Sequence, residues 1–253
     1  MITLFRRIRE RLLADGKIRT YLIYAIGEIL LVMIGILLAL QVNNWNENRI
    51  SMQEEQRIIS DLNSEFQQNL SDLDNDIDRL HSFKGSLETM MEIMIEPERV
   101  RSENKLDSLI SFTLNTPTWN PSFFVIDDLK NAGGLARLRD QKLKDALFKW
   151  ERNYSNLMEI EKSYTDASRN YIDYLSSAAS LRNIDAESSE FDIDRSVLDI
   201  NNLRLLNDYR YENYLDDFYI TATQLIDAYK EVKEEIEMIL VLSSADDEPG
   251  TNH

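Results

Sequence analysis

The hydrophobic pattern of the chain changes once, close to its beginning. Tyr21 to Leu40 is a run of twenty almost unbroken apolar residues, YLIYAIGEILLVMIGILLAL. At about 1.5 Å per residue, such a helix spans the roughly 30 Å hydrocarbon core of a bilayer. Beyond the run, apolar residues recur every three or four positions, as in helices with one buried face. The pattern predicts an all-α protein, with a single transmembrane helix over 21–42 and a helical domain over 43–242.

The stretch after the span carries a long apolar stripe with heptad-like spacing. Between Gly35 and Gly85 there is no glycine or proline that would end a helix locally. The stripe predicts a helix that continues to Ile95 and is ended by Pro97. Two alternatives stay open for the start of this helix: it continues the span directly, or it is broken at the membrane surface by Asn43, Asn44 and Asn46.

Capping and turn residues divide the rest of the chain into five further helices. They are a short helix after Ser102, a short helix begun by Asn120 and Pro121 and ended by Gly133 and Gly134, a long helix from Asp140 to about Leu175, a short helix over Val197–Leu206 and a long helix over Tyr209–Leu242. Residues 177–195 are predicted to be a mobile loop, and 243–253 a disordered tail. Helices that alternate in direction predict an elongated antiparallel bundle.

The first twenty residues are basic, whereas the rest of the chain is strongly acidic. Six basic and two acidic residues give this leader a charge of +4, and the whole chain carries -17, so the remainder carries -21. The leader is either an amphipathic helix on an anionic membrane surface or a basic flank without specific contacts. The expected interface anchors are Arg6, Arg7, Arg9, Arg11, Lys17, Arg19, Tyr21 and Tyr24 on one side and Trp45 on the other.

The apolar run is interpreted as an uncleaved signal anchor. A cleavable signal peptide is the competing interpretation, but the run is long, contains Glu28 and lacks a clean small-x-small cleavage site. Because basic residues precede the span and acidic residues follow it, the positive-inside rule predicts a cytoplasmic N-terminus and an extracytoplasmic domain. The expected location is the inner membrane of a bacterium, with the domain in the periplasm.

Composition argues against several classes of function. An acidic body repels phosphate backbones, so we expect no nucleic-acid partner. The chain has no cysteine and two distant histidines, which leaves no thiolate chemistry and no recognisable metal or cofactor site. No histidine lies near a serine in a catalytic pattern, so an enzyme is the least expected class.

Glu28 is the residue that departs from the apolar run. An ionisable group near the centre of a bilayer is costly, and its default interpretation is functional. Gly35 and Ala39 form a small-x-x-x-small pair, and Gly27 precedes the glutamate, so these residues predict a helix–helix contact in the membrane. The alternative is that Glu28 is a tolerated polar residue without a partner.

A run of aspartates and a set of tyrosines could each indicate a binding site, but a purely structural role is preferred for both. Asp72, Asp74, Asp76 and Asp78 imitate the start of a calcium loop, but Ile77 stands where the glycine is needed, so a solvated helix face is preferred. His81 is interpreted as a surface histidine. The tyrosines of the two last long helices are interpreted as core residues rather than as the lining of a ligand cleft.

Two stretches resemble a family of uncharacterised single-pass membrane proteins of Gram-negative bacteria. The first is YLIYAIGEILLVMIGILLALQVNNWNE over Tyr21–Glu47, and the second is DDLKNAGGLARLRDQKLKDAL over Asp127–Leu147. The resemblance implies a single span and an extracytoplasmic helical domain, and it implies no activity.

Two functions follow as expectations. The first is an interaction or scaffold protein that contacts the bilayer and another membrane protein, or a second copy of itself. The second is a sensory or regulatory bundle that binds a small ligand outside the membrane. About twenty cytoplasmic residues cannot hold an output domain, so such a signal would pass laterally to a partner.

Overall fold

The computed structural model describes residues 18–96, 102–131, 133–189 and 191–244, and all regular structure in these ranges is helical. The all-α class predicted from the sequence is therefore confirmed for this part of the chain. By its internal contacts the chain divides into two compact units, Met1–Arg57 and Ile58–His253, which we call unit 1 and unit 2.

The first described helix, α2, covers Ile18–Ile95 and belongs to both units. It continues through the three asparagines, so of the two alternatives left open by the sequence the continuous helix is the one observed. Asn43 donates a hydrogen bond to Glu47 one turn later, at 2.8 Å, which satisfies its side chain along the helix surface. The helix ends two residues before Pro97, as the sequence predicts.

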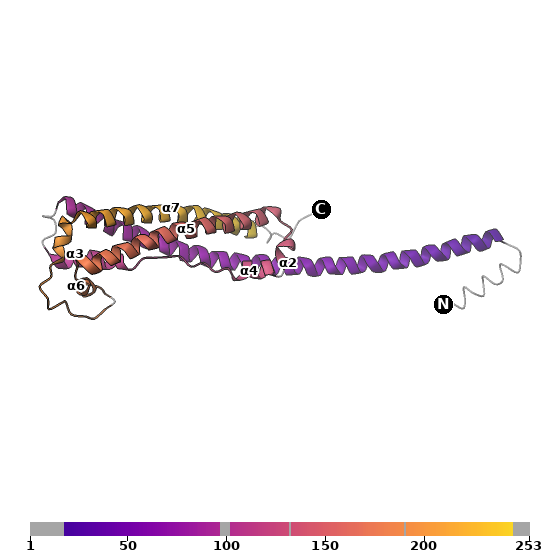
Figure 1. Cartoon of the computed structure of the whole chain (residues 1–253). Helices are drawn as coiled ribbons and strands as arrows, with labels where there is room; N and C mark the ends of the chain where they lie inside the picture. The colour runs from indigo at the N-terminus through magenta and orange to yellow at the C-terminus, as the bar shows by residue number, and fades with distance from the viewer. Residues whose placement is uncertain (1–17, 97–101, 132, 190, 245–253) are drawn as a thin grey trace. The chain divides into compact units, whose positions relative to one another are not determined.

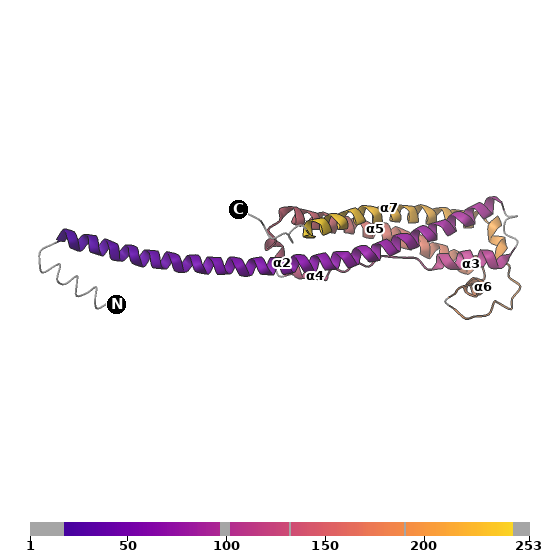
Figure 2. The same cartoon turned by 180° about the vertical axis from the view of Figure 1, so that it is seen from behind.

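Unit 2 contains the second half of α2 and seven further elements. They are α3 (Glu103–Leu114), α4 (Phe124–Asn131), η2 (Gly134–Ala136), α5 (Gln141–Ala178), α6 (Leu181–Asp185), η3 (Asn202–Asn207) and α7 (Tyr209–Ser244). The long helices α5 and α7 lie side by side, next to the second half of α2 (Figures 1 and 2). Helices α3 and α6 lie at one end of unit 2 and α4 at the other (Figures 1 and 2).

Two contacts between α2 and α7 show the relative direction of these helices. Asn63, early in unit 2, donates to Ser243 near the end of α7 at 2.7 Å. Tyr211, at the start of α7, donates to the sulfur of Met90 near the end of α2 at 3.2 Å. The two helices therefore run in opposite directions within unit 2.

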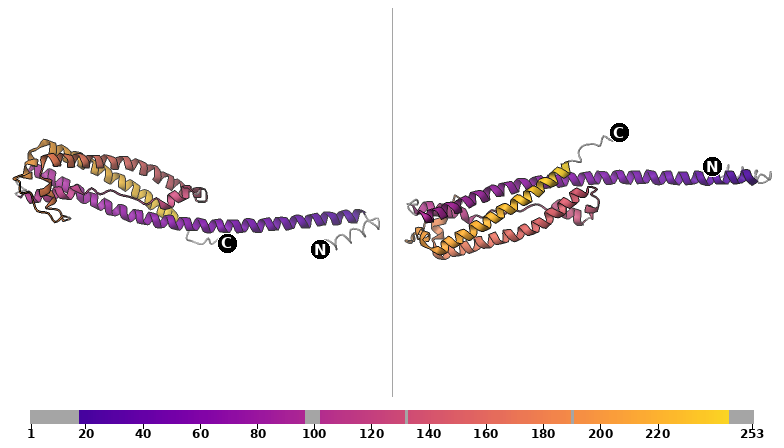
Figure 3. Two further views of the ribbon diagram at one scale, coloured as in Figure 1. Left: turned by 60° about the horizontal axis from the view of Figure 1, so that its bottom comes forward. Right: turned by 90° about the horizontal axis from the view of Figure 1, so that it is seen from above.

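Helix α5 follows the direction of α2. The rings of Phe66 and Trp150 lie 5.0 Å apart, and those of Phe83 and Tyr164 lie 5.9 Å apart, so the pairs rise together along both helices. Between α2 and α5 in the sequence, the chain runs back along the bundle through α3, an extended stretch and α4. The extended stretch is the thin connection in Figure 3.

The core of unit 2 is aromatic. Tyr164, Tyr171, Tyr211 and Tyr229 are completely buried, and the centre of each ring lies 5.4–6.2 Å from the centre of another phenylalanine, tryptophan or tyrosine ring. Such rings bury large areas and favour edge-on and offset contacts. The core interpretation of the tyrosines is confirmed for these four, whereas Tyr209 is 72 % exposed.

Helix α4 begins later than Asn120 and Pro121 predict. Its first turn is held by α2 instead: the Val125 amide donates to the carboxylate of Glu65 at 3.1 Å. One turn along α2, Asn69 exchanges two hydrogen bonds with the backbone of Ser122, at 2.8 and 2.9 Å. A helix N-terminus has unsatisfied amides, and here a carboxylate from another helix accepts one of them. The expected start at Pro121 is wrong for this tertiary reason.

Two other boundaries agree with the capping residues of the sequence. Gly133 has φ of 64°, a left-handed conformation that suits glycine, and it follows the end of α4. Asp140 accepts a hydrogen bond from the Lys142 amide at 2.7 Å and so caps α5. Helix α7 continues to Ser244, and the rest of the expected tail, 245–253, lies outside the described residues.

The segment after α5 contains helical structure that its composition does not predict. Residues expected to form a mobile loop include the end of α5 and the whole of α6. The predicted helix over Val197–Leu206 is wrong in its first half, because η3 begins only at Asn202. Asn201 caps this short helix, and its side-chain oxygen accepts a hydrogen bond from the Leu203 amide at 2.8 Å.

Candidate functional site

In the part of the chain that the structure describes, one helix is long and apolar enough to cross a membrane. This segment begins at Leu22 in α2, and none of its most hydrophobic window is buried. From Leu22 to Val42 the large apolar side chains are 42–69 % exposed. Length, composition and exposure are those of a membrane span or a signal anchor.

Glu28, Gly35 and Ala39 lie on one face of this helix. At about 100° per residue, positions 28, 35 and 39 fall within roughly 40° of one another, and Gly27 lies a quarter turn away. Glu28 is half-buried, while Gly35 and Ala39 are exposed. A Cβ atom added to Gly27 or Gly35 would meet nothing within 4 Å among the described residues. The face predicted for a helix–helix contact is open in unit 1.

The predicted interface anchors are only partly described. Arg19, Tyr24 and Trp45 are exposed, and the guanidinium of Arg49 lies 5.7 Å from the centre of the Trp45 ring. Tyr21 lies in α2, but its side chain is not described. Five anchors lie outside the described residues: Arg6, Arg7, Arg9, Arg11 and Lys17.

The four aspartates over 72–78 lie on helix α2 and not in a calcium-binding loop. Asp76 pairs with Arg79 at 2.9 Å and Asp74 with Lys233 at 2.7 Å, while His81 is exposed. Within the described ranges, no three histidine, cysteine or acidic residues come together as a metal site would require. The four acids therefore lie on a helix, as expected, but the expected solvated face is wrong for Asp76, which is buried.

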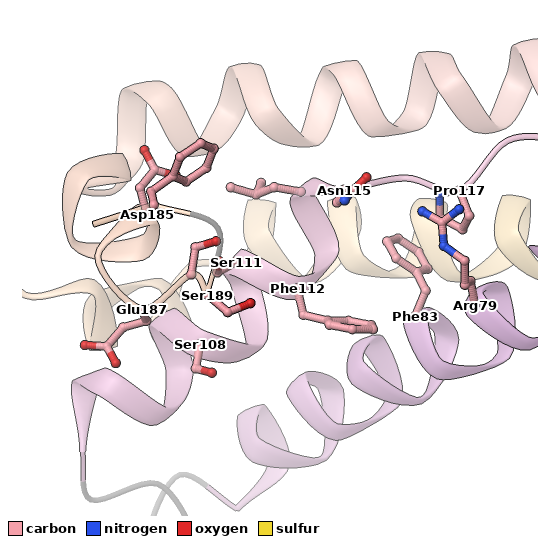
Figure 4. Close-up of a pocket in the computed structure, with 13 residues that line it drawn as sticks. Arg79, Phe83, Ser108, Ser111, Phe112, Asn115, Pro117, Asp185, Glu187 and Ser189 are labelled. Atoms are coloured by element: carbon pink, nitrogen blue, oxygen red, sulfur yellow. The ribbon is translucent and has the colours of Figure 1, made fainter. Parts of the chain in front are cut away.

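A cavity of about 730 Å³ opens at the end of unit 2 that carries α3 and α6. One wall is α2 with Arg79 and Phe83, a second is α3, and a third is formed by residues of 185–189 together with Phe191 (Figure 4). No tyrosine lines it among the described residues, in keeping with the preferred interpretation of the tyrosines as core residues. The other lining residues are Ser108, Ser111, Phe112, Leu114, Asn115, Pro117, Glu187, Ser188 and Ser189.

The two ends of this cavity have opposite charge. Figure 4 shows Asp185 and Glu187 at one end and Arg79 at the other, with Phe112 between them. Partial burial raises the pKa of Asp185 above its ordinary value. Within the described residues the Asp185 carboxylate makes no hydrogen bond or ion pair, whereas Arg79 is paired with Asp76.

A cluster around Arg195 holds the wall formed by the segment after α6. Arg195 pairs with Asp107 at 2.7 Å, with Glu187 at 2.8 Å and with Glu103 at 3.2 Å. Asn202 donates to the other oxygen of Asp107 at 2.7 Å. Asp107 is completely buried, and this burial raises the pKa of its carboxyl despite the hydrogen bonds that favour its charged form. The cluster fixes Glu187, and with it the cavity wall, to α3.

A second buried carboxyl lies in the middle of the bundle. The Tyr229 hydroxyl donates to Glu161 and accepts from the backbone amide of Trp119 at 2.9 Å, so the three residues join α5, α7 and the return segment. Burial raises the pKa of Glu161 above its ordinary value, because desolvation disfavours the carboxylate.

Glu161→Gln is expected to flatten the pH dependence of stability. Because the folded state raises the pKa of Glu161, it binds the proton more tightly than the unfolded state, and stability falls as pH rises from the ordinary glutamate range through the folded pKa. Glutamine does not titrate, and its carbonyl can still accept the Tyr229 hydroxyl. Urea unfolding of the full chain in detergent between pH 4 and pH 8 measures this slope. Glu159→Gln, an exposed neighbour on α5, is the control, and equal slopes for both variants would contradict the assignment.

The sequence predicted the face of Glu28, which stays a prediction, and it gave no prediction of the cavity. Its lining comes from segments separated by more than 100 residues, and only packing brings them together. Two weak signals were present: Ser108 and Ser111 follow one face of α3 opposite Leu106 and Ile110, and Arg195 is a lone basic residue in an acidic stretch.

Comparison with known proteins leaves the site without a precedent of known activity. No curated protein and no solved structure matches the chain. One family match covers residues 28–178, which begin within the apolar segment and end at the last residue of α5. Since this match covers more than half of the sequence, the chain belongs to a family of unknown function, DUF6090.

Proposed function

We propose that the protein is a membrane-anchored interaction protein. The observation that carries the proposal is the exposed apolar segment after Leu22, which is followed by a unit with its own aromatic core. A helix with this composition belongs in a bilayer, and unit 2 is then presented to partners at the membrane surface. An elongated antiparallel bundle is the arrangement we assign to unit 2, on the basis of the opposed contacts between α2 and α7.

The proposed location is the inner membrane of a Gram-negative bacterium. The +4 leader before the span and the acidic chain after it support a cytoplasmic leader and a periplasmic unit 2, with the span as a signal anchor. The motif around Glu28 that resembles single-pass proteins supports the same arrangement.

The partner is another membrane protein or a second copy of this chain, and it is contacted through the face of Glu28, Gly35 and Ala39. A carboxyl in lipid gains from a hydrogen-bonding partner, and small residues permit close approach of a second helix. Leu37 lies about 180° from Glu28 around the helix, so it marks the opposite, lipid-facing side.

A photo-crosslinking amino acid placed at Ala39 is expected to give a discrete protein adduct in membranes, and one placed at Leu37 much less. Glu28→Gln and Gly35→Leu in the Ala39 background should each reduce the adduct severalfold, because they remove the polar contact or block close approach. Adducts are measured by gel shift and mass spectrometry, which also separates self-association from another partner. Equal adducts at Ala39 and Leu37, or none at either, would rule out this contact.

A sensory or regulatory bundle is the second candidate, and the cavity beside α3 favours it. Pockets of about 300–1,000 Å³ with an apolar lining and a few polar groups are typical of small-molecule sites. A ligand-binding bundle would still need a partner to carry the signal, so the crosslinking result does not decide between the two functions. Ligand binding at the cavity does.

A further inference from the structure

We infer that the cavity lined by α2, α3, residues of 185–189 and Phe191 binds a small organic cation, a protonated amine attached to an apolar body. This inference rests on the ligand-binding candidate above and specifies its ligand. It does not depend on which protein the membrane helix contacts.

The apolar part of the ligand is argued from the three phenylalanines of the lining. Phe83 is buried and belongs to the core, while Phe112 and Phe191, which line the same cavity, are 50 % and 56 % exposed. Binding of an apolar group would bury these half-exposed rings, and burial of apolar surface is favourable in free energy. A cavity of about 730 Å³ has room for a body the size of one or two rings.

The positive charge of the ligand follows from the charge balance of the lining. Glu187 is paired with Arg195, and Arg79 with Asp76, each through an ion pair shorter than 3.0 Å. Asp185 is the lining charge without a partner among the described residues, and it is partly desolvated. A cation that enters the cavity compensates this carboxylate, whereas an anion would add a second uncompensated charge.

Hydroxyl groups complete the site. Ser108 and Ser111 from α3 and Ser189 from the opposite wall line the same hollow (Figure 4). A serine oxygen accepts a hydrogen bond from an ammonium N–H, so these groups can satisfy the ammonium protons that Asp185 does not reach.

The test compares three probes of one shape on the full chain in nonionic detergent. They are 2-phenylethylammonium, the neutral 2-phenylethanol and the anionic 3-phenylpropionate, titrated by calorimetry at pH 7. The expected order is clear binding of the ammonium, at least tenfold weaker binding of the alcohol and no binding of the acid. Asp185→Asn should weaken ammonium binding at least tenfold, since it removes the charge and keeps the shape.

Two further variants keep the result interpretable. Asp192→Asn removes the same charge from an exposed residue next to Phe191 that does not line the cavity, and binding should be unchanged. Ser111→Phe fills the cavity from a half-exposed position and should abolish binding of every probe, with the helical circular dichroism spectrum retained. Equal binding of the ammonium and the alcohol, or no loss in Asp185→Asn, would overturn the cation assignment and leave a ligand site of another class. Failure of all three probes to bind would overturn the site together with the ligand-binding function.

Discussion

Trp150→Ala is expected to destabilise unit 2 by about 3–5 kcal/mol, the range for removing a large buried aromatic side chain. Trp150 is completely buried on α5, and its ring lies 5.0 Å from Phe66 of α2 and 5.0 Å from Phe123 of the return segment. One side chain therefore joins three segments, and the cavity left by alanine cannot be filled by a single neighbour. Urea unfolding of the full chain in detergent, followed by circular dichroism, measures the loss.

Two variants test whether the effect comes from packing. Trp45→Ala removes the same side chain from a position in unit 1 that is 66 % exposed, and it should change the free energy of unfolding by less than about 0.5 kcal/mol. Trp150→Phe should cost less than half as much as alanine. It retains a ring and removes the indole N–H, which is buried without a hydrogen bond in the described residues. An alanine variant as stable as the natural protein would show that this aromatic contact does not hold the three segments together.

Arg195→Met is the second substitution with a large expected effect. It should lower the free energy of unfolding by about 3 kcal/mol, at the low end of the range for breaking a buried ion pair. The low end applies because Arg195 is 30 % exposed, whereas Asp107 is completely buried. Without the guanidinium, the Asp107 carboxylate retains Asn202 but loses its counter-charge in a low-dielectric site. The loss is measured by urea unfolding at pH 7.

The pH dependence of this variant identifies Asp107 as the cause. Removal of a neighbouring cation raises the pKa of the carboxyl further, so the folded state takes up a proton more readily than the unfolded state. The destabilisation should therefore shrink as pH falls from 7 toward 5, and Arg195→Met combined with Asp107→Asn should recover much of the stability. Arg169→Met, in an exposed pair with Asp166, is the matched control and should have little effect. A loss that does not vary with pH would mean that Arg195 acts through packing alone.

The long helices could be predicted from the sequence because their causes are local. Pro97 ends α2, Asp140 caps α5, and the left-handed Gly133 follows α4, and each of these effects acts within a few residues. The start of α4 could not be predicted in this way. Its Val125 amide donates to Glu65, sixty residues earlier in the chain, and no local sequence pattern predicts such a distant partner.

The same distinction separates the two candidate sites. The face of Glu28 follows from the period of a single helix, so the sequence suffices to place Gly35 and Ala39 beside it. The cavity depends on Arg195 pairing with Asp107, eighty-eight positions away, which turns a stretch of serines and acids into a fixed wall. Composition alone predicts a mobile loop there, because composition does not show which acidic and basic residues form ion pairs in the folded chain.

The hydrogen bond from Asn63 to Ser243 has a practical consequence for the geometry of unit 2. It places the last turn of α7 against the first turns of α2 in this unit, so the polypeptide enters and leaves unit 2 at the same end. A label or purification tag attached after Ser244 would emerge beside the entry point. Helices α3 and α6 and the cavity lie at the other end of unit 2, so such a tag would be far along the bundle from them.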